Sequence, residues 1–209
     1  MKKHLLAALL TVGIAASAFS QGNVAFVNNA SGFKAPIFGP ELADPSVALQ
    51  GNTASGLPAG TTVYTGPALA GPGFTAQIWS APDATSSLQP SLNTTTFRTG
   101  GAAGFFNLVN ATLPNVAKDA TTATLQVRVW DNQGGAIADW AAAVAANATR
   151  GQSATFTAAN IGGDFNTPPT ITGLRSFNIT GAAAATPEPG TLALAGLGAA
   201  ALLIFRRRK

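Results

Sequence analysis

Two short alternating runs place a tryptophan beside polar side chains, a combination that suits sugar binding. Gln77 and Trp79 share one face of an expected strand, and Arg128 and Trp130 share one face of another, because side chains two residues apart point the same way. If these strands are neighbours, the two rings form a platform that stacks on sugar faces, and Asp131 adds a hydrogen-bonding group. The alternative is that a helix or long loops cover this face. The tryptophans then form a second core layer, as large aromatic side chains usually do.

Two carboxylates near a glycine turn offer hard oxygen ligands for Ca²⁺. Asp131 precedes the Gly134-Gly135 pair and Asp139 follows it, but the spacing is not that of an EF-hand loop. The alternative is local, because Asp side chains also shape turns and cap helices. We favour the local role, predict no cofactor, and keep Asp131 and Asp139 as a weak calcium candidate.

Histidine and cysteine are missing from the chain after its first residues. The one histidine is His4, and there is no cysteine. A Ser-His-Asp triad, a Cys-His pair, a His or Cys metal site and a disulfide are therefore excluded downstream of residue 20. Carboxylate chemistry of the glycoside-hydrolase kind stays open, but the seven acidic residues between 21 and 180 form no recognisable pair. We predict that the protein is not an enzyme.

Residues 21–180 are broken by Gly, Pro, Thr, Asn and Ser into short alternating runs, which is typical of strands and turns. The expected strands lie at residues 22–28, 62–65, 74–79, 104–109, 124–131, 153–157 and 176–180. Residues 32–60 and 81–90 are expected to be loops. The pattern predicts a mostly β domain, an antiparallel β-sandwich or jelly-roll-like fold, with one short helix.

The expected helix covers residues 140–147. Asp139 is placed to cap its N-terminus and Gly151 to end it. Trp140 and Val144 are four residues apart and are expected to share its buried face.

Residues 1–20 have the pattern of a secretory signal peptide. Lys2 and Lys3 precede an apolar run from Leu5 to Ala16, and Ala18-Phe19-Ser20 puts small residues before a cut ahead of Gln21. A cut after Ala18 and an uncleaved N-terminal anchor are the alternatives.

The C-terminal end is a second targeting segment, joined to the domain by a small-residue linker, residues 181–186. Residues 187–209 comprise Pro187-Glu188-Pro189, an apolar run from Thr191 to Phe205, and a basic cluster. The cluster is Arg206, Arg207, Arg208 and Lys209. The run predicts a short transmembrane helix of about 22 Å, whose basic end stays inside the cell. A buried apolar helix with a basic end is the alternative.

The basic charge of the chain belongs to its two ends. Residues 21–180 hold six basic and seven acidic residues, a formal charge of about −1. The domain therefore has no basic field to attract a phosphate backbone, and we predict no nucleic-acid partner.

Pro-Glu-Pro, a short hydrophobic helix and a terminal arginine cluster together resemble the PEP-CTERM sorting signal of Gram-negative bacteria. The same tail is also catalogued as the C-terminal domain of ice-binding proteins. The body is similar to PEP-CTERM proteins of Verrucomicrobia-like bacteria, a group of no established activity. The carriers of that likeness include residues 21–24, 35–40, 64–66, 96–100 and 127–131.

The resemblance implies processing by an exosortase, a membrane-embedded cysteine protease that cuts near the Pro-Glu-Pro. Together with signal peptidase at the N-terminus, it implies a precursor in the inner membrane and a mature form in the cell envelope or outside the cell. We expect a structural or adhesive role at the cell surface or in the extracellular matrix. The alternative is a carbohydrate-binding module for the matrix exopolysaccharide, with contacts from Trp79, Trp130, Gln77 and Arg128.

Overall fold

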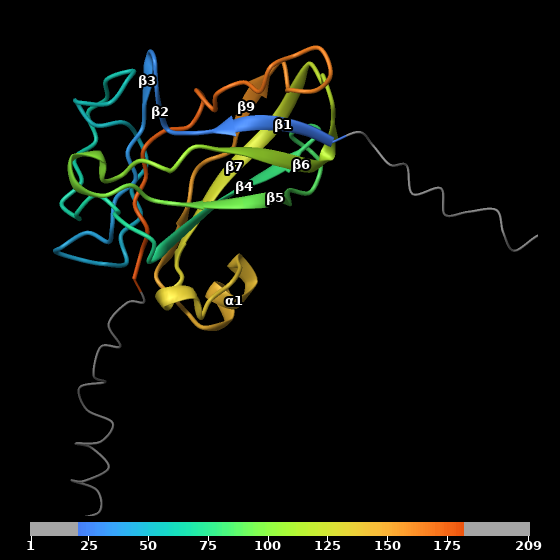
Figure 1. Ribbon diagram of the computed structural model, residues 1–209. Coiled ribbons are helices and arrows are strands. Elements are labelled where there is room, and N and C mark those ends of the chain that lie inside the picture. The colour runs from blue at the N-terminus through green and yellow to red at the C-terminus, as the bar shows by residue number, and fades with distance from the viewer. Residues whose placement is uncertain (1–20, 182–209) are drawn as a thin grey trace, which may run out of the picture.

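The computed structural model describes residues 21–181, and this part of the chain folds into antiparallel β-structure with one α-helix (Figure 1). The strands are β1 Gln21–Phe26, β2 Asn29–Ala30, β3 Phe33–Lys34, β4 Phe74–Ala81, β5 Gln89–Thr96, β6 Val109–Ala117, β7 Thr122–Asp131, β8 Arg150–Gln152 and β9 Phe156–Ala159. Helix α1 is Trp140–Ala145, and 3₁₀ turns occupy Gly100–Ala102 and Gln133–Gly135. The predicted signal peptide and the predicted sorting tail, residues 187–209, lie outside the described residues.

Two sheets make up most of the body, and β2 and β3 pair with each other as a separate two-stranded sheet. The larger has the order β5-β4-β7, with β8 and β9 both pairing with β7, and the smaller pairs β1 with β6. All of these pairings are antiparallel. In Figure 1 the β1–β6 pair crosses over the larger sheet. The predicted mostly β, antiparallel architecture is confirmed.

The main core lies between the two sheets. Val24 and Phe26 of β1 face Ile78 of β4 and Leu125 and Val127 of β7, and all five are fully buried. On β7 the inward residues alternate as the sequence predicts. Ring-to-ring contacts extend this core, since Phe26 lies 4.7 Å from Phe106 between ring centroids.

Both long edges of the small sheet are occupied. On one side β5 runs beside β6, where the Thr112 amide donates to Asn93 Oδ1 over 3.0 Å. On the other side the segment after β9 covers β1, because the Asn23 and Ala25 amides donate to the carbonyls of Gly162 and Pro169. The two layers are thus joined at both sides, and β1 has no free edge for pairing with another chain.

Several expected boundaries differ from the structure. The sequence does not predict strands β5 and β6, and residues 62–65 form no strand. Of the expected strand at 153–157, residues 153–155 form the break after β8 and the last two residues lie in β9. Residues 176–180 run extended and make isolated bridges, with Phe177 and Ile179 buried as expected.

Helix α1 begins as predicted and then departs from the expectation. The Asp139 side chain accepts a hydrogen bond from the Ala142 amide. The predicted pairing of Trp140 with Val144 is wrong, because Ala143 turns to the sheet and Val144 is 47% exposed. Gly151 lies in β8, so it does not end the helix. Asn147 follows the last turn instead, with a left-handed φ of 49°.

Within residues 21–181 no helix is both long and apolar enough to cross a bilayer.

Candidate functional site

The outer face of the large sheet brings together three of the four residues predicted to contact a glycan. Gln77 pairs with Arg128 across β4 and β7, and Trp79 is the next outward residue on β4. The Arg128 Cζ atom lies 3.7 Å from the centroid of the Trp79 ring and 5.2 Å from that of Trp140. The outer face is therefore built around one arginine that contacts two indole rings.

Trp130 does not belong to an exposed platform. It is fully buried, and its Nε1 donates to the Ile137 carbonyl over 3.2 Å. Its neighbours in a second, smaller core are Ile137, Ala143 and Ala148, so α1 and the turn before it cover the ring. The prediction that Trp130 stacks on a sugar is wrong, and the alternative of a second core layer is right for this residue. Strand alternation predicts only that the Trp130 ring points away from the main core. It does not predict whether another element covers the ring.

Two polar side chains around Trp79 form hydrogen bonds within the protein. Arg128 Nε donates to Gln126 Oε1 over 2.9 Å, and Gln77 Nε2 donates to the Ser91 carbonyl over 2.9 Å. Burial lowers the pKa of Arg128 from its ordinary value. Because the guanidinium covers a face of the Trp79 ring, that face is closed to a stacked sugar. We conclude that this cluster holds the sheet and α1 together.

Asp131 and Asp139 both bind the backbone locally. Asp131 Oδ1 accepts from the Gln133 amide, and Asp139 Oδ1 accepts from the Ala142 amide, each over 2.8 Å. The two carboxylates therefore have the turn and cap roles that the sequence offered as the alternative. In the part of the chain that the structure describes, no three His, Cys, Asp or Glu side chains are grouped to hold a metal ion.

Three adjoining hollows lie elsewhere, along the segment around Gln50. Their volumes are about 360, 220 and 400 Å³. Gln50 lines the first two, and Gly51 and Arg175 line the second and third. The Gln50 side chain ties its loop to the β8–β9 connection, because its Oε1 accepts from the Ala154 amide over 2.6 Å. The hollows thus form a row with Gln50 between the first and the second.

Two arginines supply the charge of this row. Arg150 lines the first hollow and Arg175 the other two, and no acidic residue is among the described residues that line them. Arg150 Nη1 donates to the Ala148 carbonyl over 3.0 Å, whereas Arg175 is exposed. The sequence does not predict either arginine as a site residue, because two arginines 25 residues apart form no motif before the chain is folded.

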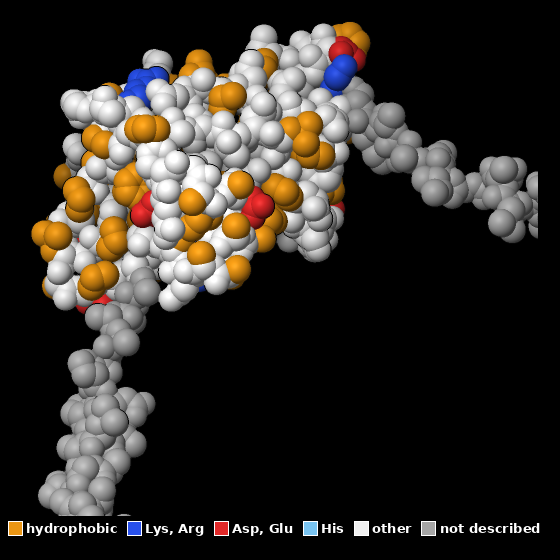
Figure 2. All heavy atoms as spheres, turned by 60° about the horizontal axis from the view of Figure 1, so that its bottom comes forward, with side chains coloured by type: hydrophobic (Ala, Val, Ile, Leu, Met, Phe, Trp, Pro, Cys, Tyr) orange, Lys and Arg blue, Asp and Glu red, His pale blue; other side chains and the backbone are white. Residues whose placement is uncertain are grey.

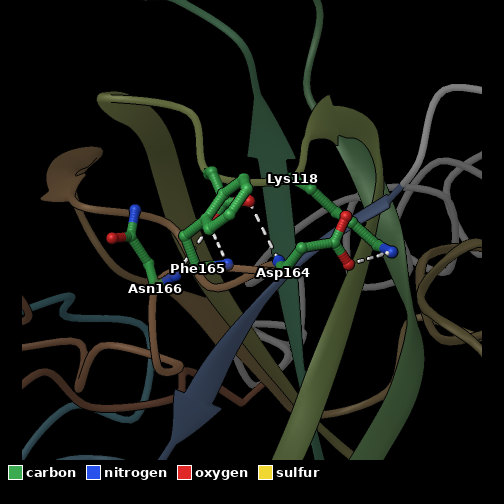
Figure 3. Close-up of polar contacts among 5 residues, drawn as sticks. Lys118, Asp164, Phe165 and Asn166 are labelled. Atoms are coloured by element: carbon green, nitrogen blue, oxygen red, sulfur yellow. Dashed lines mark hydrogen bonds and ion pairs between the residues drawn. The ribbon is translucent and has the colours of Figure 1, made fainter.

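A third polar cluster shapes the loop after β9 (Figure 3). The Asp119 carboxylate accepts hydrogen bonds from the amides of Asp164, Phe165 and Asn166, at 2.9, 3.1 and 2.7 Å. These bonds lower the pKa of Asp119, that from Asn166 most. Lys118 Nζ lies 2.7 Å from Asp164 Oδ1, the only ion pair within residues 21–181. The cluster fixes the loop that presents Phe165, which is 92% exposed.

The comparison with protein families concerns the end of the chain. A family model described as the PEP-CTERM protein-sorting motif matches residues 185–209. The chain carries a PEP-CTERM sorting motif. The match includes Pro187, Glu188 and Pro189 and the basic cluster Arg206 to Lys209. It confirms the resemblance noted from the sequence, and it concerns the tail rather than the β domain.

No curated protein and no solved structure matches the chain.

The PEP-CTERM motif makes the chain an exported protein that is targeted to an exosortase, with a membrane-anchored precursor that is destined for the cell surface. The motif begins four residues after Gly181, the last described residue, and Gly181 lines the first hollow. The Gly181 amide donates to the Pro45 carbonyl over 2.9 Å. The domain is therefore fixed up to the residue at which the sorting segment leaves it.

Proposed function

We propose that the mature protein is a non-enzymatic structural or adhesive component of the cell surface or extracellular matrix. In this proposal signal peptidase cuts ahead of Gln21 and an exosortase cuts near Pro187, which leaves the β domain as the functional unit. The observation that carries the proposal is the PEP-CTERM motif, which begins at residue 185, four residues after the last described residue of the antiparallel β domain.

The use of the carboxylates supports a role without catalysis. Each acidic side chain of residues 21–181 accepts a hydrogen bond from a backbone amide, a hydroxyl or a lysine. These side chains are Glu41, Asp44, Asp83, Asp119, Asp131, Asp139 and Asp164. Carboxylates that hold turns, caps and loops in this way are committed to structure, whereas glycoside hydrolysis needs two that face a substrate across one cleft.

The test is the intact mass of the protein in each fraction of its native host. We expect a species that begins near Gln21 and ends near Pro187 in the medium or matrix. A variant with Pro187→Ala, Glu188→Ala and Pro189→Ala should instead keep its basic end and stay in the membrane fraction. Replacing Ala182, Ala183 and Ala184 by serine is the matched control and should not change sorting, because these residues precede the matched motif. If the unaltered protein keeps Arg206 to Lys209 in the membrane fraction, the proposal of release is wrong.

A second candidate function, glycan binding, is favoured by the row of hollows rather than by the tryptophans. Arg150 and Arg175 line hollows in which no described residue is acidic, and such a lining suits the acid groups of a polysaccharide chain. Hydrogen bonds to charged groups contribute about 1.5–3 kcal/mol. Removing one such contact should therefore weaken binding by about tenfold or more.

Binding of polygalacturonate and of neutral dextran to the protein tests this second function. We expect polygalacturonate to bind more tightly, and Arg175→Gln to weaken that binding while Arg98→Gln does not, because Arg98 lines none of the three hollows. Equal affinity of all three proteins for polygalacturonate would exclude the hollows as the site and leave the structural role untouched.

A further inference from the structure

Large hydrophobic side chains are exposed on the loops beside the point where the sorting segment leaves the domain. Leu42 is 75% exposed, Val63 is 76% exposed and Val47 is 40% exposed. We call these three residues the exit face. Single exposed apolar residues are ordinary on a protein surface. These three differ because they are grouped and lie beside the point where the sorting segment leaves the domain.

Hydrogen bonds hold the exit face together. The Leu42 amide donates to Thr65 Oγ1 over 3.1 Å, which brings the loop of Leu42 to that of Val63. The Val47 carbonyl accepts from Asn178 Nδ2 over 2.9 Å, just before the chain leaves at Gly181. In Figure 2 this end of the molecule comes forward, and hydrophobic side chains lie around the place where the described chain ends.

The length of the linker decides what the exit face meets. Nine residues, 182–190, separate Gly181 from Thr191, the start of the expected transmembrane helix. Fully extended, nine residues span at most about 30 Å. The membrane-anchored precursor thus holds its domain within that distance of the bilayer, and it holds it by the end that carries Leu42, Val47 and Val63.

We propose that the exit face rests on the bilayer in the membrane-anchored precursor and leaves the bilayer when the linker is cut. The proposal rests on the sorting motif and on the predicted helix at 191–205. Three side chains form a weak contact, but a short linker to an anchored segment gives an effective concentration of about millimolar, which favours even weak contacts. Cutting near Pro187 removes that concentration, so the contact does not retain the mature protein.

The absence of cysteine from the chain allows a direct test. The chain from Gln21 to Lys209, which lacks the predicted signal peptide, takes one environment-sensitive fluorophore through Leu42→Cys, Val63→Cys or Phe165→Cys. It is reconstituted in phosphatidylethanolamine–phosphatidylglycerol vesicles that contain spin-labelled lipid. Phe165 is the control, because it lies on the loop after β9, at the end of the domain opposite to residue 181 (Figure 1).

We expect labels at positions 42 and 63 to emit at shorter wavelength and to be quenched by the lipid several-fold more than the label at 165. Equal quenching at the three positions would overturn the proposal. If labels 42 and 63 are shielded from water but not quenched by the lipid, the proposal is wrong and the exit face contacts another protein or a second copy of the chain. Diluting the protein in the vesicles then distinguishes these two cases, because only contact with a second copy weakens on dilution.

A cleavage experiment tests the dependence on the linker. A protease site placed between Ala184 and Ala185 lets the linker be cut in the vesicles. We expect the lipid quenching at positions 42 and 63 to disappear and the domain to leave the vesicles on flotation. A domain that stays bound after the cut would overturn the linker-dependent contact.

Paired substitutions separate this contact from sorting itself. Leu42→Asp with Val63→Asp should reduce the quenching of a label at Val47→Cys, and Leu92→Asp with Leu108→Asp, equally exposed but outside the exit face, should not. Unchanged quenching in the first pair would contradict the proposal. The intact-mass test reports sorting independently, because neither pair touches Pro187 to Pro189.

Discussion

The sheets and the long loops of this domain are ordered by different interactions. In the sheets, apolar side chains from β1, β4 and β7 pack into one continuous core in which Phe26, Ile78 and Val127 are fully buried. Loss of one side chain there leaves a cavity whose cost depends on how far the neighbours can relax.

In the loops between β1 and β4, buried polar side chains add hydrogen bonds to the apolar packing of Phe33, Ile37 and Leu69. Asn28 Nδ2 donates to the carbonyls of Ala35 and Gly104, and its Oδ1 accepts from the Phe106 amide. Asn52 and Asn178 likewise bridge loop backbones that lie far apart in sequence. A loop held in this way depends on single side chains, because each one satisfies several buried backbone groups at once.

The largest effect should come from the sheets. Phe26→Ala removes a fully buried ring and should lower the free energy of unfolding by about 3–5 kcal/mol, measured by urea denaturation. Phe165→Ala is the matched control, because the same change at a ring that is 92% exposed should stay within about 0.5 kcal/mol. Similar values for the two variants would contradict the core that we describe.

Asn28→Leu should have the next largest effect and tests the loops. It keeps the volume roughly constant but leaves the buried Ala35 carbonyl and Phe106 amide without partners, whereas the Gly104 carbonyl still accepts from the Ile37 amide. Since an unsatisfied buried group costs about 1–3 kcal/mol, we expect a loss of about 3 kcal/mol after relaxation. Asn29→Leu, at the exposed neighbouring residue, is the control. If Asn28→Leu is as mild as its control, the loops are held by something other than this side chain.

Tyr64→Phe should lower the free energy of unfolding by a smaller amount at neutral pH. The sign of the stability difference should reverse at alkaline pH. The Tyr64 hydroxyl lies 2.8 Å from the Gly51 carbonyl and 2.9 Å from the Ser176 carbonyl, and its loss should cost about 1 kcal/mol at neutral pH. Burial first, and Glu41 second, raise the pKa of Tyr64 above its ordinary 10.0. The wild-type protein should therefore lose stability as pH rises above about 10, whereas the variant lacks this loss.

This crossover can be followed by denaturation at a series of pH values. Tyr64 is the only tyrosine of the chain, so ultraviolet absorbance of the phenolate reports its ionisation alone. A constant difference between the two proteins from neutral to alkaline pH would show that the hydroxyl is not buried.

The two regions also differ in how well the sequence predicts them. The alternation in β7 and the Asp139 cap could be predicted, because strand phase and helix capping depend on residues close together in the chain. Strands β5 and β6 contain Pro90 and Pro114, which argue against central strands. Pro90 lies on β5, the end strand of the larger sheet, and Pro114 lies where the register between β1 and β6 is interrupted, and proline is tolerated at both kinds of position. The bonds of Asn28, Asn52 and Asn178 join residues up to 131 apart in the chain, and no local pattern reports them.

The candidate site shows the same limit. Trp79, Arg128 and Trp130 were placed correctly on the outer face of the sheet, but their exposure depends on α1 and on Trp140, which packs 6.4 Å from Trp130 between ring centroids. Arg150 and Arg175 line neighbouring hollows only because the folded chain places Gln50 in the lining of both. The sorting motif could be predicted in full, because its recognition depends on a contiguous segment.

Replacing Asp119 should have the smallest effect on global stability. Its hydrogen bonds hold the loop after β9 (Figure 3). Asp119→Asn weakens acceptors for three amides of residues 164–166, so their hydrogen exchange should quicken at neutral pH with little change in global stability. Because the folded pKa of Asp119 lies below 3.8, its contribution is present above that value and is lost as pH falls through the folded pKa. The difference in exchange rate between the two proteins should therefore narrow below pH 3.8.

Asp83→Asn is the control, since Asp83 bonds only to residues 85 and 86 and its loss should leave hydrogen exchange at residues 164–166 unchanged. Equal exchange in wild type and Asp119→Asn would mean that the loop presenting Phe165 holds its shape without the carboxylate.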